Sequence, residues 1–299
     1  MHINFSRLHI YQECPRKYYW RFIRNLVPDR DAPALMLGKA VHLALASHYS
    51  PVRPDKEPQA PLVQPLLSPD AQIDTFYDDY LKSHSLLQPE IDDIHKQQAY
   101  AHLIYSEYRR IYPTEPFTTL APEVFGSFEL GDHTVHFQTD APISWRGSVW
   151  ILEHKTLSPT ASLDLFFKRF THDLQVRVYM HGVRTHLNIL PVGVLINVLR
   201  KSRKMDSVDL QRDVLLIPEA DLNTTIAHFH LQIEELADLH EMSTVPPEGQ
   251  KPHWFMHTGN CISFNRTCPY FDLCTRENTA SLAEFRVREP DYVDEGDHT

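Results

Sequence analysis

Apolar and polar residues follow a helical period through most of the first third of the chain. Ser6 stands where a helix-capping residue is expected, and Pro15 suits the first turn of a second helix. Apolar positions three and four residues apart continue in the segments that follow. The pattern predicts helices over residues 6–12, 15–22, 35–49, 70–82 and 91–111.

From about residue 117 the apolar positions take the spacing of β-strands. This spacing predicts strands over residues 117–130, 134–140 and 147–155, the last beginning at a turn around Arg146-Gly147, and later strands over 192–199 and 207–216. Helical spacing returns over residues 163–190 and 219–242. The order of the elements predicts an α/β core with a helical insertion: helices come first, followed by three strands, a crossover helix and further strands.

Two segments depart from this periodic pattern. Residues 51–69 are rich in proline, which excludes a long helix or a central strand and predicts a surface connection within an insertion over about residues 50–112. Residues 285–299 are rich in acidic side chains and predict a disordered tail. The length of 299 residues fits one large domain, and we expect this domain to cover residues 1–284.

The charge balance limits how the chain can bind nucleic acid. The net charge is −10, from 29 basic and 39 acidic residues, so any contact with DNA has to be local rather than a bulk electrostatic capture. No uninterrupted apolar run is long enough to span a membrane, and the first residues lack the pattern of a secretion signal. We expect a cytoplasmic protein that does not contact a membrane.

Residues 151–157, Ile-Leu-Glu-His-Lys-Thr-Leu, carry the most informative chemistry. Glu153 and Lys155 are two positions apart on a predicted strand, so both side chains lie on one face. Asp140 precedes Glu153 by thirteen residues and ends the preceding predicted strand. Two carboxylates that share a hard cation beside a lysine suit metal-assisted hydrolysis of phosphodiesters. Taken singly, Asp140 and Lys155 also fit ordinary solvated strand ends.

The four cysteines occur in two places, Cys14 near the start and Cys261, Cys268 and Cys274 near the end. A reducing compartment disfavours disulfides, so metal ligation is the better interpretation of clustered thiols. Four thiolates suit either zinc or an iron–sulfur cluster. The alternative is a set of buried free cysteines without metal.

Six segments together resemble one family. They are Ser6-Arg7-Leu8 with Tyr11 and Cys14-Pro15-Arg16-Lys17-Tyr18, Gly38-Lys39-Ala40-Val41-His42, Gln138-Thr139-Asp140, Leu152-Glu153-His154-Lys155-Thr156, Gln175 with Tyr179, and the three-cysteine run. In this order they resemble the RecB-type branch of the PD-(D/E)xK nuclease superfamily that carries an iron–sulfur cluster. That branch includes AddB-type and CRISPR-associated RecB-like exonucleases and small phage-encoded relatives.

The resemblance implies a restriction-endonuclease-like α/β core, a central mixed sheet flanked by helices, with a C-terminal cysteine segment. It implies that Asp140, Glu153, the His154 backbone carbonyl and His42 bind Mg²⁺ or Mn²⁺. Lys155 would orient the attacking water, and Gln175 and Tyr179, four apart on one helix face, would face the scissile strand. Glu123 would be an outer member of the site. The four cysteines would hold a [4Fe–4S] cluster.

Local basic clusters are the candidate contacts to DNA. One set lies beside Cys14 and the other between two predicted strands; they comprise Arg16, Lys17, Arg21 and Arg24, and Arg200, Lys201, Arg203 and Lys204. The interleaved aromatic residues Tyr18, Tyr19 and Trp20 could stack on bases of a single strand. The ordinary alternative for this pattern is a helix with one charged face in solvent and one packed face in the core.

These observations together predict a metal-dependent DNA exonuclease that acts on single strands or duplex ends in recombination, repair or replication. No nucleotide-binding Gly-x-x-x-x-Gly-Lys-Ser/Thr loop occurs, so a helicase or recombination partner would supply any unwinding. A catalytically silent DNA-end-binding or adaptor protein, and an endonuclease, remain alternatives on the same fold.

Overall fold

The structure is a computed structural model that describes residues 1–50, 67–242, 254–263, 266–275 and 279–288. Contacts between residues divide the chain into two compact units. One contains residues 1–31, residues 126–137 and the described residues from 222 onward, and the other contains residues 32–125 and 138–221. The predicted proline-rich connection lies almost wholly outside the described residues.

A five-stranded mixed sheet organises the unit that begins at residue 32. Its strands, in the order β3-β6-β7-β8-β9, are β3 (Thr118–Thr119), β6 (Ala141–Trp145), β7 (Ser148–Leu157), β8 (Gly193–Lys201) and β9 (Val208–Leu216). Strands β7 and β8 are parallel, and the other neighbouring pairs are antiparallel. The connection from β7 to β8 contains α6 (Leu163–Phe170) and α7 (Leu174–Leu187). Parallel neighbours require such a helical crossover.

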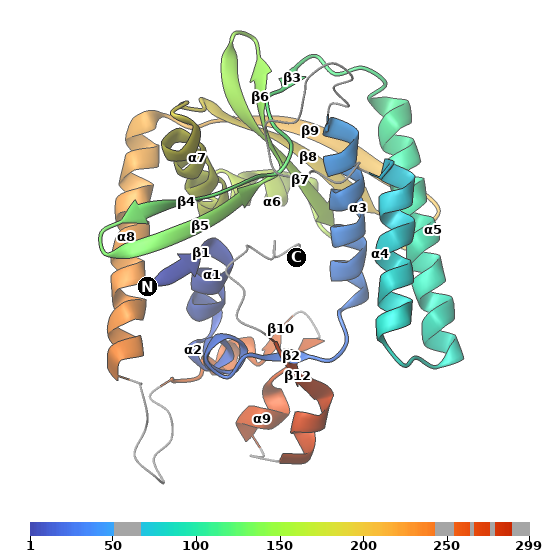
Figure 1. The fold of residues 1–299 in the computed structure, drawn as a ribbon, viewed down its shortest axis with the longest axis vertical. Coiled ribbons are helices and arrows are strands. Elements are labelled where there is room, and N and C mark those ends of the chain that lie inside the picture. Colours follow the sequence, from blue (N-terminus) through green and yellow to red (C-terminus); the bar gives the residue numbers. More distant parts are fainter. Residues whose placement is uncertain (51–66, 243–253, 264–265, 276–278, 289–299) are drawn as a thin grey trace. The chain divides into compact units, whose positions relative to one another are not determined.

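Three helices, α3 (Pro33–Tyr49), α4 (Pro69–Ser83) and α5 (Gln88–Ile111), lie side by side in this unit (Figure 1). Apolar residues of α3, α4 and α5 form one core with sheet residues such as Leu152 and Leu195. The helices predicted over residues 35–49, 70–82 and 91–111 are therefore confirmed, with α5 beginning three residues earlier. The core fixes α3, and with it His42, to the sheet.

The other unit combines a small sheet with helices from both ends of the chain. Strand β1 (His2–Asn4) pairs in parallel with β5 (His133–Thr139), which neighbours β4 (Val124–Leu130). Helices α1 (Phe5–Glu13) and α2 (Pro15–Tyr18) and the π-helix η1 (Tyr19–Ile23) follow β1. Helix α8 (Glu219–Met242) begins and ends as predicted, and its residues from 222 onward belong to this unit.

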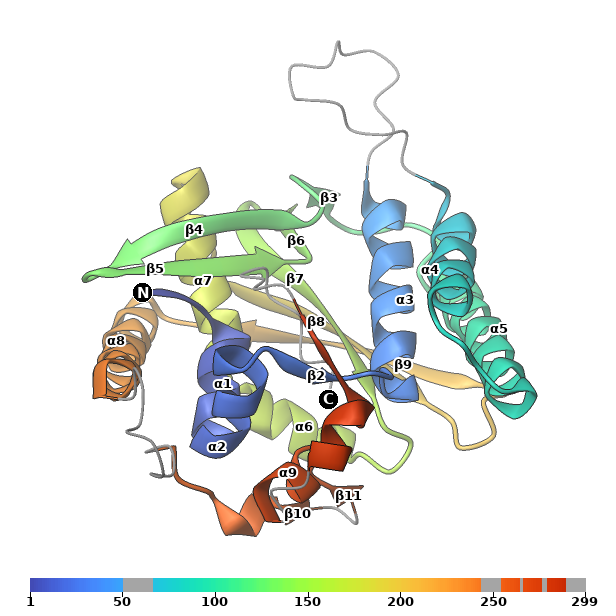
Figure 2. The same ribbon diagram turned by 60° about the horizontal axis from the view of Figure 1, so that its bottom comes forward.

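The C-terminal part of this unit is built of short elements (Figure 2). They are η2 (Thr258–Asn260), β10 (Ile262–Ser263), β11 (Arg266–Thr267), α9 (Phe271–Thr275), η3 (Thr279–Glu284) and β12 (Phe285–Val287). Strand β12 pairs with β2 (Leu26–Pro28) in antiparallel register. The ordered chain thus continues past residue 284, where the disordered tail was predicted to begin.

Several local predictions were wrong for identifiable reasons. The helix predicted over residues 163–190 is two helices, because the Asp173 side chain accepts from the backbone N–H of Val176 and starts α7 anew. Asn4, not Ser6, caps α1 by accepting from the backbone N–H of Arg7. Strand β6 was missed because Pro142 stands inside it. The segment 117–130 contains two strands, β3 and β4, instead of one.

The mixed α/β class and the flanking helices agree with the predicted restriction-endonuclease-like core. The turn predicted at Arg146-Gly147 joins β6 to β7, and both residues have positive φ, 52° and 76°. Such a two-residue turn matches the twist of the strands it connects. No helix within the described residues combines the length and apolar character that crossing a bilayer requires.

Candidate active site

Asp140 lies between β5 and β6, beside the strand that carries Glu153. The antiparallel register pairs Ala141 with Leu152, which places Asp140 next to the following residues of β7. Its Oδ2 accepts a hydrogen bond from the backbone N–H of His154 at 2.7 Å, and its Oδ1 lies 3.1 Å from Nδ1 of His42 on α3. Three of the predicted site residues, distant in the sequence, therefore meet at one carboxylate.

Glu153 and Lys155 form a buried ion pair on one face of β7. Nζ of Lys155 lies 2.9 Å from Oε1 of Glu153 and donates to Oε1 of Gln175 at 2.6 Å. The Gln175 amide in turn donates to the hydroxyl of Tyr179 at 2.8 Å. The spacing of four residues on α7 brings Gln175 and Tyr179 together, as the sequence predicts. These hydrogen bonds hold the Lys155 amine near the carboxylates of Asp140 and Glu153.

Glu123 lies beside Asp140, as predicted for an outer member of the site. Its backbone N–H donates to the carbonyl oxygen of Asp140 at 2.7 Å. Burial and the negative charge of Asp140 raise the pKa of the Glu123 carboxyl. Glu123 has a φ of 41°, a conformation that costs energy for a residue with a side chain. The chain therefore accepts backbone strain next to the acidic group.

The two carboxylates differ in their electrostatic surroundings. Burial alone would raise the pKa of Asp140, but the charge of His42 and the hydrogen bonds from His42 and His154 outweigh it and lower the pKa. Burial raises the pKa of Glu153 to about 7, although Lys155 opposes the shift. Burial opposes the charged form of Lys155, but the charges of Glu153, Asp173 and Asp140 and the hydrogen bond to Glu153 together raise its pKa. The surroundings thus favour the ionised form of Asp140 and the protonated form of Glu153.

The donor set fits a hard divalent cation. Oε2 of Glu153 is buried and has no hydrogen-bond partner among the described residues. Oxygen ligands suit Mg²⁺, and the imidazole of His42 suits Mn²⁺ better. Within the described chain the ligand atoms of His42, Asp140 and Glu153 do not all lie within 4.8 Å of one another. Oε1 of Glu153 lies 2.9 Å from Nζ of Lys155.

Sequence reasoning missed a buried polar network behind His154. Nδ2 of Asn197 on β8 lies 3.2 Å from Nδ1 of His154 and donates to the hydroxyl of Tyr108 at 2.6 Å. Arg212 on β9 donates to Oδ1 of Asn197 and makes a bidentate ion pair with Glu115. These contacts fix the ring of His154 and, through it, the backbone that holds Asp140. Asn197, a polar residue in the apolar run of β8, is the one sequence signal of the network.

Comparison with known families decides the assignment. The profile of the PD-(D/E)XK nuclease superfamily matches residues 2–275. The chain belongs to the PD-(D/E)XK nuclease superfamily. Membership makes it a nuclease-type phosphodiesterase whose relatives generally use Mg²⁺ or Mn²⁺.

Two solved structures show a weak likeness to this superfamily member. A "Putative exonuclease" from Eubacterium rectale has 14% sequence identity and a TM-score of 0.44, over 79% of this chain and 80% of that one. SSO0001 has 13% identity and a TM-score of 0.28, over 72% of this chain and 96% of that one. No curated protein sequence matches the chain.

The four cysteines of this PD-(D/E)XK protein all belong to the unit that contains the chain's first residues. The backbone N–H of His257 donates to Sγ of Cys14 at 3.4 Å, and Nε1 of Trp20 donates to Sγ of Cys274 at 3.3 Å. Burial raises the pKa of Cys274, and the charges of other thiols, Cys14 among them, raise it further. The sulfurs therefore lie within electrostatic range of one another.

The basic residues near Cys14 that were predicted to bind DNA also contact other groups of the protein. Nε of Arg16 donates to the Trp254 carbonyl at 2.7 Å, and Lys17 pairs with Glu13 at 2.5 Å. The Arg21 guanidinium lies over the Phe22 ring. Tyr18 is fully buried, so its predicted stacking on a base is wrong.

The second basic cluster straddles the end of β8. Arg200 and Lys201 are the last residues of that strand, and Arg200 pairs with Asp209 at 2.6 Å. Arg203 and Lys204 are exposed in the turn that follows. Arg203 and Lys204 are therefore the members of the cluster best placed for a phosphate backbone.

Proposed function

We propose that this PD-(D/E)XK protein is a metal-dependent DNA exonuclease of the RecB/AddB-like type, acting on single strands or duplex ends. The observation that supports the proposal is the meeting of His42, Asp140, Glu153 and Lys155 in one buried cluster. This combination of two carboxylates, an imidazole and an amine has no evident structural purpose, because burying charges is costly unless they serve a site.

Each residue has a role that its contacts support. Asp140, Glu153, His42 and the His154 carbonyl would hold the cation. When bound, Mg²⁺ or Mn²⁺ supplies hydroxide near neutral pH and offsets negative charge on the phosphate. Lys155, kept protonated by Glu153, would orient the attacking water and stabilise the charge that develops on the phosphate oxygens. Gln175 and Tyr179 would keep the Lys155 amine in position.

We propose further that Cys14, Cys261, Cys268 and Cys274 hold a structural [4Fe–4S] cluster. Tetrahedral zinc with Zn–S bonds of about 2.3 Å would hold its sulfurs roughly 3.8 Å apart. Among the described residues, no three cysteine sulfurs lie within 4.8 Å of one another. The N–H donors to Cys14 and Cys274 are also typical partners of cluster sulfurs. Brown colour and about four irons per chain in anaerobically purified protein would support the cluster, whereas stoichiometric zinc would refute it.

DNA is the proposed substrate, with Arg203 and Lys204 as phosphate contacts and Arg16, Lys17, Arg21, Arg200 and Lys201 as flanking basic residues. The acidic net charge of −10 requires such contacts to be local. A helicase or recombination partner in the cytoplasm would supply unwound ends. A basic turn at the end of β8 supports backbone contacts without sequence preference.

The experiment compares single-stranded linear, double-stranded linear and covalently closed circular DNA, all uniformly labelled, with Mn²⁺ or Mg²⁺. The wild type should release nucleotides from linear DNA and leave closed circles intact. Lys155→Ala should lower the rate at least about 100-fold. Lys168→Ala, an exposed lysine of α6, is the matched control and should retain the wild-type rate.

Two other outcomes would select the alternatives. Equal background release by the wild type and Lys155→Ala would indicate a catalytically silent DNA-binding protein. Cleavage of closed circles would indicate an endonuclease on the same core.

A further inference from the structure

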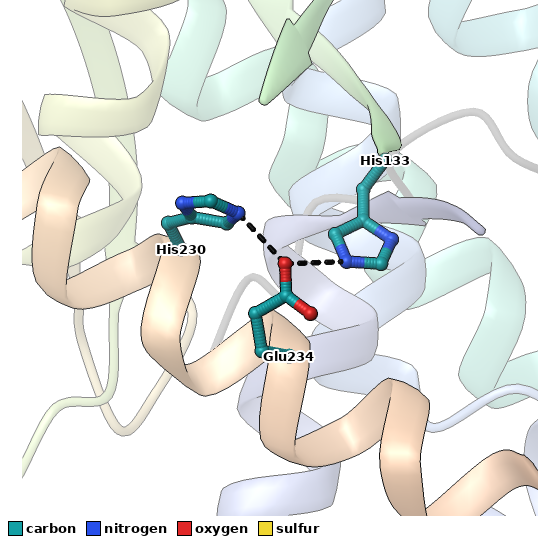
Figure 3. Close-up of side chains that lie close together, drawn as sticks. All are labelled: His133, His230 and Glu234. Carbon is teal, nitrogen blue, oxygen red and sulfur yellow. Dashed lines mark hydrogen bonds and ion pairs between the residues drawn. The ribbon is translucent and has the colours of Figure 1, made fainter. Parts of the chain in front are cut away.

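His133, His230 and Glu234 bring three metal-binding groups together (Figure 3), and none of the three is a residue of the proposed nuclease site. His133 is the first residue of β5, and His230 and Glu234 are four apart on α8. Residues at this spacing project from the same helix face. All three belong to the unit that contains the chain's first residues. We call them the His133–His230–Glu234 triad.

The distances within the triad suit a small tetrahedral ion. Oε1 of Glu234 lies 2.9 Å from Nε2 of His230 and 3.2 Å from Nε2 of His133. The three ligand atoms all lie within 4.8 Å of one another, the one such group among the described residues. Zinc binds histidine nitrogen and carboxylate oxygen at about 2.0–2.2 Å, which places tetrahedral ligand atoms roughly 3.3 Å apart. The carboxylate already stands at that separation from both rings.

His133 presents a buried nitrogen to the triad. The residue is 6% exposed, and its Nδ1 is occupied by the Met1 nitrogen at 3.0 Å. Its Nε2 is buried and meets no hydrogen-bond geometry with a described residue, but it lies 3.2 Å from Oε1 of Glu234 as an ion pair. A buried imidazole nitrogen that faces a carboxylate without a well-formed hydrogen bond can gain by binding a cation between the two groups. The other nitrogen's partner fixes the ring with Nε2 directed at the triad.

The turn between β4 and β5 leaves room for the second imidazole. Gly131 has a φ of 59°, and a Cβ on it would stand 2.4 Å from Nε2 of His230. Glycine at this position serves the turn and also lets the His230 ring approach the hairpin. The ring could not occupy its present position beside a larger residue.

We propose that the His133–His230–Glu234 triad binds a divalent transition-metal ion, with Zn²⁺ the best match. Two imidazoles and one carboxylate are a donor set that zinc takes, and the two imidazole nitrogens are ligands that Mg²⁺ and Ca²⁺ disfavour. The side chains of His230 and Glu234 are 33% and 48% exposed, so the ion has an entry path and a fourth position open to water. A bound ion ties the β4–β5 hairpin to α8. The proposal does not depend on the nuclease activity.

Zinc binding to the full-length protein, measured by equilibrium dialysis after treatment with chelator, tests the proposal. The variants are Glu234→Gln, which keeps the shape of the side chain but removes its charge, and His230→Gln. The control is His228→Gln, an exposed histidine on the same helix. Zinc bound at the cysteines or the nuclease site is common to all four proteins and cancels in the comparison.

Wild type and His228→Gln should each bind one more zinc ion than the two triad variants, or bind it at least about 100-fold more tightly. Zinc should also raise the melting temperature of wild type and His228→Gln more than that of Glu234→Gln. Circular dichroism establishes that each variant is folded. If Glu234→Gln does not fold, His230→Gln serves as the triad variant in the comparison. Equal zinc content and equal melting shifts in all folded proteins would overturn the proposal and leave a metal-free triad held by ion pairs to Glu234.

Discussion

The backbone N–H of His154 lies 2.7 Å from Oδ2 of Asp140, although the two residues are fourteen positions apart in the sequence. The contact exists because β6 and β7 pair in antiparallel register immediately after Asp140. It fixes one carboxylate oxygen of Asp140 and stabilises its ionised form. The rest of the proposed site is arranged around this anchored anion.

Gln175 should act as a positioning residue for Lys155. Replacing it with Met removes the 2.6 Å hydrogen bond to the Lys155 amine while keeping the side chain's length. We expect the maximal rate of DNA hydrolysis to fall about 10- to 100-fold with little change in the DNA concentration needed for half-saturation. Steady-state kinetics measure both quantities. Gln98→Met, which removes a hydrogen bond from a half-buried glutamine of α5 to Asp74, should change neither, and an unaltered rate for Gln175→Met would remove the residue from the mechanism.

The buried ion pair behind the site should be important for stability. Arg212 and Glu115 are each largely buried, so Arg212→Lys breaks a bidentate pair and should lower the free energy of unfolding by about 3 kcal/mol. Arg200→Lys, at the more exposed pair with Asp209, should cost less than about 1 kcal/mol. Urea unfolding measures both. Similar losses at the two positions would contradict the role assigned to burial.

His154 should make stability depend on pH. Burial is the main cause that lowers the pKa of His154 from 6.5 to about 3. Between these values the unfolded chain binds the proton and the folded protein does not, so stability is complete above pH 6.5 and falls as the pH falls. The wild type should therefore lose about 2 kcal/mol more than His154→Asn between pH 7 and pH 5. Parallel stability curves for the two proteins over this range, measured by urea unfolding, would disprove the assignment.

The N–H donor of Trp20 should tune the proposed iron–sulfur cluster. Trp20→Phe keeps an aromatic ring but removes the hydrogen bond to Sγ of Cys274. Hydrogen bonds to cluster sulfurs stabilise the reduced state, so the reduction potential should become more negative. Electrochemical titration followed by electron paramagnetic resonance measures the change. Tyr19→Phe, whose hydroxyl contacts Arg24 instead of a cysteine, should leave the potential as in the wild type.

Much of the site can be predicted from the sequence, but the rest depends on the register in which the strands pair. The apolar run before Glu153 predicts a buried strand, and the two-residue spacing places Lys155 on the same face. The contact of His42 with Asp140 spans 98 positions, so only the family resemblance could propose it. The network behind His154 requires the pairing of Asn197 with Arg212 across β8 and β9. Strand register of this kind is set by the whole sheet and not by local pattern.

Loss of one carboxylate tests the proposed catalytic centre most directly. Release of labelled nucleotides from linear DNA is measured with Mn²⁺ for the wild type, Asp140→Asn and the exposed control Asp164→Asn of α6. The account predicts that Asp140→Asn reduces the rate at least about 100-fold, because the neutral amide no longer supplies an anionic ligand, while Asp164→Asn matches the wild type. Wild-type hydrolysis by a folded Asp140→Asn protein would contradict it.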